Sequence, residues 1–157
     1  MTKFLLAVHV IAAIVAIGPV TVAASMFPPA ARRALASPDD PRASETVRLL
    51  HRICRVYATI GVVVPVFGFA TASSMGVLGD AWLIVSIALT ALAAVVLVAL
   101  VLPRQSALLE GAEGVEGAVG GSREATVRLA MFTGVFNLLW AAVTVLMIIR
   151  PGSTTGA

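Results

Sequence analysis

The two histidines of this chain are its main candidates for chemistry, and only one of them lies deep inside an apolar stretch. His9 falls within the uncharged stretch 4–27, whereas His51 precedes the next apolar stretch. An imidazole in apolar surroundings can hold a metal ion or a haem iron, or it can relay protons. Alanines follow His9 at helical offsets of three, four and seven, which leaves room for a flat ligand or a close-packed helix. His9 is therefore the candidate cofactor-binding residue.

A haem b site with two histidine ligands would require His9 and His51 to meet. His9 is 18 residues from Phe27 at the far end of its stretch, about 27 Å along a helix. One chain cannot supply both ligands, so a second copy or a partner would have to. Alternatively, His9 only packs, through an interhelical hydrogen bond of about 0.6 kcal/mol to a hydroxyl of similar depth, in Thr71, Ser86 or Thr144. We predict this packing role and no cofactor, with haem b as the alternative, and interpret His51 as an interfacial polar residue.

Asn137 lies in a second polar stripe, with Thr133, Ala141 and Thr144 on the same helical face. Such a stripe can bind another helix or line a path for a small solute. The long apolar stretches contain no Asp, Glu, Lys or Arg, so an ion pathway would lack its usual charged groups. We predict helix packing, with solute transport as an alternative.

Arg48, Arg52 and Arg55 recur at spacings of four and three ahead of the second apolar stretch. Their guanidinium groups are expected on one face at the membrane interface, where anionic lipid headgroups or a partner's acidic surface can bind them. Cys54 has no second cysteine to pair with and is interpreted as a small apolar filler. The sequence contains no recognisable combination of nucleophile, base and metal ligands, so we predict neither a catalytic site nor a metal site.

The composition explains why polar candidates are so few. The 157 residues are 59% hydrophobic and 12% charged, with a mean hydropathy of +1.01, which leaves too little polar surface for a water-soluble globule. Four stretches reach the roughly 20 residues needed to cross a membrane: 4–27, 56–75, 81–102 and 129–149. Because lipid cannot pair open strand edges, we predict an all-α fold, a four-transmembrane-helix bundle forming a single membrane domain over 1–157.

The positions of the cations predict the orientation of the bundle. Nine of the 11 Lys and Arg residues fall in the connections 28–55 and 103–128, against Lys3 and Arg150 on the other side. Positively charged loops stay in the cytoplasm, so both termini are expected on the outer side of a plasma membrane. The net charge of +3 then reflects topology, and we expect no nucleic-acid partner. A cleaved signal peptide is the alternative, but it would export the connection that carries six arginines.

The tetrapeptide TVRL occurs at 46–49 and at 126–129, each time before an apolar stretch. The shift of 80 residues aligns the second helix with the fourth, so the bundle could consist of two parallel helical hairpins. The alternative to a repeat is that arginine followed by apolar residues recurs wherever helices enter membranes.

Short signals mark the helix starts and one linker. Asp40 before Pro41 and Ser122 before Arg123 indicate helix starts. The glycine- and glutamate-rich segment 110–120 is interpreted as a flexible acidic linker.

Two longer segments, "KFLLAVHVIAAIVAIGPVTVAASMFPPAARRA" and "LLHRICRVYATIGVVVPVFGFATA", resemble the bacterial four-helix proteins grouped as predicted integral membrane proteins of unknown function. The shared features are His9, Gly18, the pair Arg32 and Arg33, and Pro65 with Gly68. The chain is more distantly similar to copper-resistance D-type proteins and membrane protoporphyrinogen oxidases, and that resemblance implies haem binding at His9. The tryptophan and paired glycines that often follow this histidine there are replaced by Ala16, Ile17 and Gly18.

The predicted function is that of a non-catalytic accessory subunit of a larger membrane complex, such as a bacterial respiratory terminal oxidase. The lack of a catalytic constellation and of buried charge favours this function. The expected partners are the lipid bilayer and other membrane protein subunits. A haem- or metal-binding protein that uses His9, and a small-solute transporter, are the alternatives.

Overall fold

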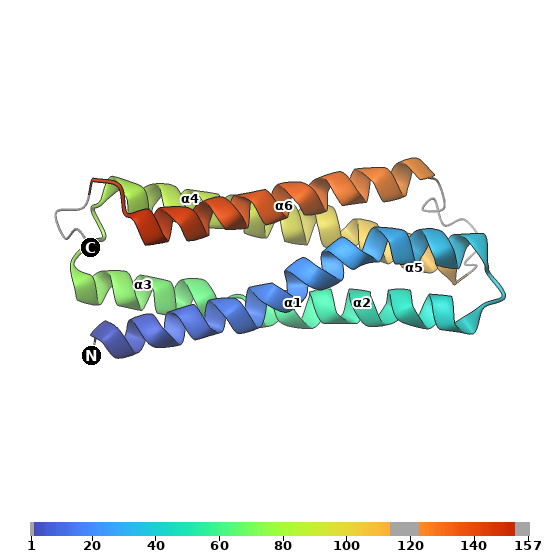
Figure 1. Ribbon diagram of the computed structural model, residues 1–157, viewed down its shortest axis with the longest axis horizontal. Coiled ribbons are helices and arrows are strands. Elements are labelled where there is room, and N and C mark those ends of the chain that lie inside the picture. Colours follow the sequence, from blue (N-terminus) through green and yellow to red (C-terminus); the bar gives the residue numbers. More distant parts are fainter. Residues whose placement is uncertain (1, 114–122, 153–157) are drawn as a thin grey trace.

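A computed structural model describes residues 2–113 and 123–152, and all regular secondary structure within these ranges is helical (Figure 1). The elements are α1 (Thr2–Ala36), α2 (Pro41–Ile60), α3 (Val63–Met75), α4 (Ala81–Val95), the π-helix η1 (Val96–Val101), α5 (Leu102–Ala112) and α6 (Arg123–Ile149). They form four segments long and apolar enough to cross a membrane: Thr2–Ala36, Pro41–Met75, Ala81–Ala112 and Arg123–Ile149. The predicted all-α fold with four long apolar helices is confirmed.

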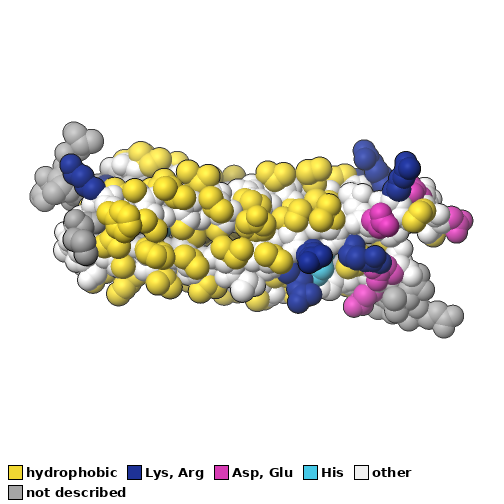
Figure 2. Space-filling model, turned by 90° about the horizontal axis from the view of Figure 1, so that it is seen from below, with side chains coloured by type: hydrophobic (Ala, Val, Ile, Leu, Met, Phe, Trp, Pro, Cys, Tyr) yellow, Lys and Arg dark blue, Asp and Glu magenta, His cyan; other side chains and the backbone are white. Residues whose placement is uncertain are grey.

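The four segments run side by side, and α1 begins at the same end of the bundle at which α6 ends (Figure 1). α1 packs against α2, α3 and α6, and α4 packs against α6. Figure 2 shows Lys and Arg side chains gathered at the opposite end, which we call the arginine-rich end, while hydrophobic side chains cover most of the remaining length. An apolar exterior of this extent suits helices whose outer faces contact lipid.

The structure differs from the prediction in the two long connections. α1 continues to Ala36 and α2 begins at Pro41, so only 37–40 of the predicted connection 28–55 lies outside a helix. As expected, Asp40 caps α2, and its carboxylate accepts the Arg42 N–H at 3.0 Å. α5 likewise carries the third segment to Ala112, inside the predicted connection 103–128. Hydropathy marks only the part of a helix that lies in lipid, and these helices continue beyond that part as polar turns.

α6 is helical from Arg123, the first described residue of this part of the chain. The predicted cap Ser122 and most of the predicted acidic linker, 114–120, lie outside the described residues. The two TVRL copies lie in different surroundings, because the Thr46 side chain is exposed on α2 whereas Thr126 is fully buried on α6.

Two of the four segments change helical geometry close to a proline. Pro65 has no N–H, and the Gly61 carbonyl accepts the Val64 N–H at 3.1 Å instead, where α2 gives way to α3. Pro103 follows the π-helical turn η1 that joins α4 to α5. Turns of this kind are rare and recur near functional positions, and here the turn directly precedes the helix that carries Gln105.

The most completely buried part of the bundle lies toward the arginine-rich end. Phe27, Leu108, Leu129 and Phe136 are among its largest enclosed side chains, and they belong to one apolar cluster formed by α1, α2, α4, η1, α5 and α6. Nearer the other end the apolar clusters are smaller. The polar side chains described next therefore lie beside the tightest packing in the molecule.

Candidate functional site

His51 is buried between α2 and α5. Its side chain is 8% exposed, and its Nδ1 lies 3.2 Å from Gln105 Oε1. The Phe27 ring packs against the imidazole edge-on, with the ring centroids 6.4 Å apart. Because an amide oxygen can only accept, Nδ1 carries the hydrogen that it donates to Gln105.

Gln105 connects His51 to two further polar groups. Its side chain is fully buried, and its amide Nε2 donates to Cys54 Sγ at 3.5 Å. Ser106 Oγ lies 3.4 Å from His51 Nε2 and 3.3 Å from the Leu102 carbonyl oxygen. The Ser106 hydroxyl can donate to a neutral His51, or it can accept from a protonated His51 while donating to Leu102. This buried cluster therefore provides hydrogen-bond partners for His51 in both protonation states.

The protonation of His51 is biased by its surroundings. The residue lies outside the apolar stretch 56–75, at the arginine-rich end of α2. Burial lowers the pKa of His51 below its ordinary value, and the nearby positive charge of Arg55 acts in the same direction, while the hydrogen bond to Gln105 opposes both. The neutral imidazole therefore predominates at pH 7.

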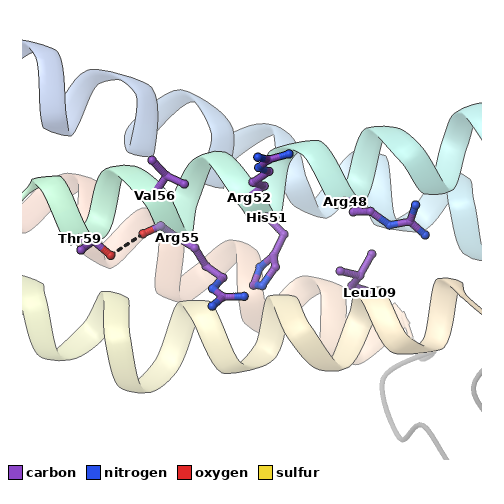
Figure 3. A pocket seen from close by; sticks show the side chains of 7 residues that line it. All are labelled: Arg48, His51, Arg52, Arg55, Val56, Thr59 and Leu109. Carbon is purple, nitrogen blue, oxygen red and sulfur yellow. Dashed lines mark hydrogen bonds between the residues drawn. The ribbon is translucent and has the colours of Figure 1, made fainter.

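An open pocket of about 520 Å³ lies beside His51, and three arginines of α2 line it. Figure 3 shows Arg55 and His51 extending from α2 toward α5, with Arg48 one turn further along α2. Arg48 forms an ion pair with Glu113 at 2.6 Å. Within residues 2–113 and 123–152, neither Arg52 nor Arg55 forms an ion pair. The structure thus brings the three predicted interface arginines, Arg48, Arg52 and Arg55, to one pocket, and two of them have no ion-pair partner among the described residues.

His9 lies far from this pocket, in contact with α3. Its Nδ1 is 3.0 Å from the Val64 carbonyl oxygen, to which it must donate. The ring lies so close to Gly68 that a Cβ placed there would be 2.8 Å from His9 Cε1, so a glycine is what permits this approach. Val64 is 13 residues beyond His51 in the chain, about 20 Å along a helix, and the two imidazoles lie in separate places.

The hydroxyl groups that we proposed as partners of His9 bond elsewhere. Thr71, Ser86 and Thr144 each donate to the carbonyl oxygen four residues earlier in their own helix. The actual partner of His9 is a main-chain carbonyl, which a count of side-chain hydroxyls by depth could not identify. Thr71 and Ser86 are nevertheless buried, whereas Thr144 is exposed.

Asn137 connects α6 to α1, and a groove between these helices adjoins it. Its Nδ2 donates to Ser25 Oγ at 3.1 Å, while Asn137 Oδ1 and Thr133 Oγ1 are buried without a hydrogen-bond partner among the described residues. The groove has a volume of about 230 Å³. Its lining consists of Ser25, Pro28, Pro29 and Arg32 from α1 and Ala130, Thr133, Gly134 and Asn137 from α6.

The α1 wall of this groove is also unusual in its main chain. Pro28 and Pro29 lie inside α1 and have no N–H, so the carbonyl groups of Ala24 and Ser25 lack their usual helical donors. On the α6 wall, Ala130 and Gly134 are four residues apart, and nothing lies within 4 Å of a Cβ placed at Gly134. The groove therefore combines unsatisfied polar groups with an open small-residue face.

These features define an integral membrane protein with four long apolar helices, a buried polar cluster at its arginine-rich end and a polar groove between α1 and α6. The chain belongs to the family described as predicted integral membrane protein (DUF2269), whose sequence profile matches residues 3–151. The predicted membership of a family of integral membrane proteins of unknown function is thereby confirmed. No curated protein and no solved structure shows significant similarity to the chain.

Proposed function

We propose that this protein is a non-catalytic accessory subunit that binds a transmembrane helix of a larger membrane complex in the groove between α1 and α6. The groove itself is the main support for this function, because the polar residues Asn137 and Thr133 line it beside the open face at Gly134. Lipid tails offer no hydrogen bonds, so a groove lined by polar side chains inside a membrane favours another helix over lipid as its occupant. The 130–134 pair of small residues would allow the backbone of that helix to approach closely.

The partner that fits is a transmembrane helix with a small apolar face and a hydrogen-bond donor level with Asn137. Interhelical hydrogen bonds in membranes contribute about 0.6 kcal/mol on average and at most about 1.7 kcal/mol. Packing on the open face at Gly134 must therefore supply most of the affinity. The bacterial setting of the resembled families makes a respiratory terminal oxidase the first assembly to examine, with the arginine-rich end inside the cell.

Leucine at Gly134 is expected to abolish this association without unfolding the bundle, since nothing lies within 4 Å of a Cβ at that position. A photo-reactive amino acid at the exposed Leu138 should yield a cross-linked product in native membranes. Its peptides, identified by mass spectrometry, should include a transmembrane segment of a different chain. In Gly134→Leu the yield should fall at least about tenfold, equivalent to 1.4 kcal/mol.

Gly79→Leu is the matched control, because Gly79 also has open space around its Cβ position but lies between α3 and α4, outside the groove lining. This variant should leave the cross-link yield unchanged. Cross-links only to lipid or to a second copy of the chain would contradict the accessory role. An equal fall in both leucine variants would likewise exclude the groove as the docking site.

A specific contact supports a second candidate function, ligation of a metal or haem iron by His9. The Nδ1–H bond to the Val64 carbonyl fixes the tautomer that leaves Nε2 free to act as a ligand, as second-sphere hydrogen bonds do in metal sites. The fit is incomplete: no group of three His, Cys, Asp or Glu residues in the described ranges could hold a metal ion. His51, the other imidazole, lies elsewhere, so a partner would have to supply the second axial ligand.

Absorption spectroscopy of the protein in gently solubilised membranes distinguishes this candidate function. Haem ligation predicts a Soret band that co-purifies with the chain and disappears in His9→Ala. In a matched His51→Ala variant the band should persist, because His51 is distant from His9. A colourless protein that retains its cross-linked partner would exclude the haem function and leave the accessory function intact.

A further inference from the structure

We propose that the pocket between α2 and α5 binds the phosphate group of an anionic phospholipid, with Arg52 and Arg55 as its ligands and the lipid tail along α2 and α3. The pocket lies at the arginine-rich end, where the charged part of the bundle meets its apolar sides (Figure 2). This site is distinct from the α1–α6 groove, so the inference is independent of the proposed partner helix.

Charge is the first reason to expect an anion in this pocket. Arg48, Arg52 and Arg55 lie within two turns of α2, and positive charges at such spacings repel one another. Glu113 neutralises only Arg48. A guanidinium group can donate two parallel hydrogen bonds to a phosphate, and Arg52 and Arg55 are the two arginines of the pocket lining that form no ion pair among the described residues.

The apolar surface beside the pocket is the reason to choose a lipid over a free phosphate ion. Val56 and Thr59 form the wall of the pocket on the side of the apolar stretch. Val56 and Ile60 are exposed on α2 and follow Arg52 at spacings of four, and Val63 is exposed at the start of α3. An acyl chain can cover this apolar surface while its headgroup remains with the arginines. Inorganic phosphate would leave the surface bare.

His51 provides a charge that can respond to the bound phosphate. It lines the pocket, and Gln105 and Ser106 can accept hydrogen bonds from both of its nitrogens when it is protonated. The other charged and titratable groups around it are Arg48, Arg52, Arg55 and Cys54 on α2, and Glu113 through Arg48; α1 presents the Phe27 ring. A phosphate beside this positive group would favour the imidazolium form, so lipid affinity should rise as pH falls.

Binding of short-chain lipids to the detergent-solubilised full chain tests the proposal. Dihexanoyl phosphatidylglycerol should bind saturably, dihexanoyl phosphatidylcholine at least about tenfold more weakly, and inorganic phosphate should not displace the bound lipid at equal concentration. Arg52→Gln combined with Arg55→Gln should weaken phosphatidylglycerol binding at least about tenfold, because two charge-assisted contacts are lost.

The matched control is Arg33→Gln combined with Arg123→Gln, which removes the same charge from exposed positions outside the pocket. Here the affinity should stay within about twofold of wild type. An equal loss in both double variants would show diffuse attraction and overturn the site. Displacement by inorganic phosphate would overturn the lipid assignment. A pH dependence that persists unchanged in His51→Gln would overturn the role of His51.

Discussion

Phe27→Ala is expected to lower the free energy of unfolding of this protein by about 3–5 kcal/mol, the range for a phenylalanine removed from a packed core. Phe27 is 0% exposed and belongs to the main apolar cluster, and its ring also lies against His51. Removal of the Phe27 ring would leave a cavity in the main apolar cluster, where α1 meets α2. Titration with a denaturing detergent, followed by circular dichroism, measures this change.

Phe69→Ala provides the control for this measurement. Phe69 is 60% exposed on α3 and faces the surroundings of the bundle, so its truncation should change stability by no more than about 0.5 kcal/mol. The contrast separates packing between helices from contact with lipid, which is as apolar as the side chains themselves. Equal losses in the two variants would mean that Phe27 does not occupy an enclosed core.

The number and course of the membrane helices could be predicted from the sequence because lipid imposes a length on every crossing segment. The helix start at Asp40 and Pro41 could be predicted as well, since capping depends on neighbouring residues. The continuation of α1 to Ala36 and of α5 to Ala112 could not be predicted from the sequence. Beyond the hydrocarbon layer, hydropathy no longer separates a polar helix from a loop.

The buried cluster around His51 was not predicted for the same reason, because it lies beyond the apolar stretches that hydropathy identifies. Gln105 lies just after Pro103, in a segment expected to be a loop, so its burial against Cys54 and His51 was not predicted. One signal was available, because Leu108 and Ala112 follow Gln105 at offsets of three and seven, which places all three on one helical face. The partner of His9 had no such signal, since its acceptor is a main-chain carbonyl.

Hydropathy places His9 deeper in the membrane than His51, yet His51 is the more buried of the two in the protein. His9 lies in the apolar part of α1, yet its described contacts are a main-chain carbonyl and the surface left free by Gly68. His51 lies in the charged part of α2 and is the more deeply buried of the two. Depth in the membrane and burial in the protein are separate quantities, and the sequence reports the first much better than the second.

Gln105→Leu should reveal how strongly the His51 cluster holds α5 to α2. Leucine nearly preserves the volume of the 0% exposed Gln105 side chain but leaves His51 Nδ1–H buried without an acceptor, which costs about 1–3 kcal/mol. Cys54 offers a direct measurement, because it is the one cysteine of the chain and is fully buried. If Gln105→Leu lowers the free energy of opening this part of the bundle by about 2 kcal/mol, the modification of Cys54 by a maleimide should become roughly 30-fold faster.

A second substitution distinguishes the hydrogen bond from a packing defect. His51→Phe combined with Gln105→Leu replaces both partners by apolar side chains, and such a pair is expected to recover most of the stability lost in Gln105→Leu. Ser106→Ala should have a much smaller effect, since its 3.4 Å contact with His51 is long. Losses that simply add in the double variant would mean that His51 and Gln105 act independently. Recovery would show that the polar cluster is an energetic unit between α2 and α5.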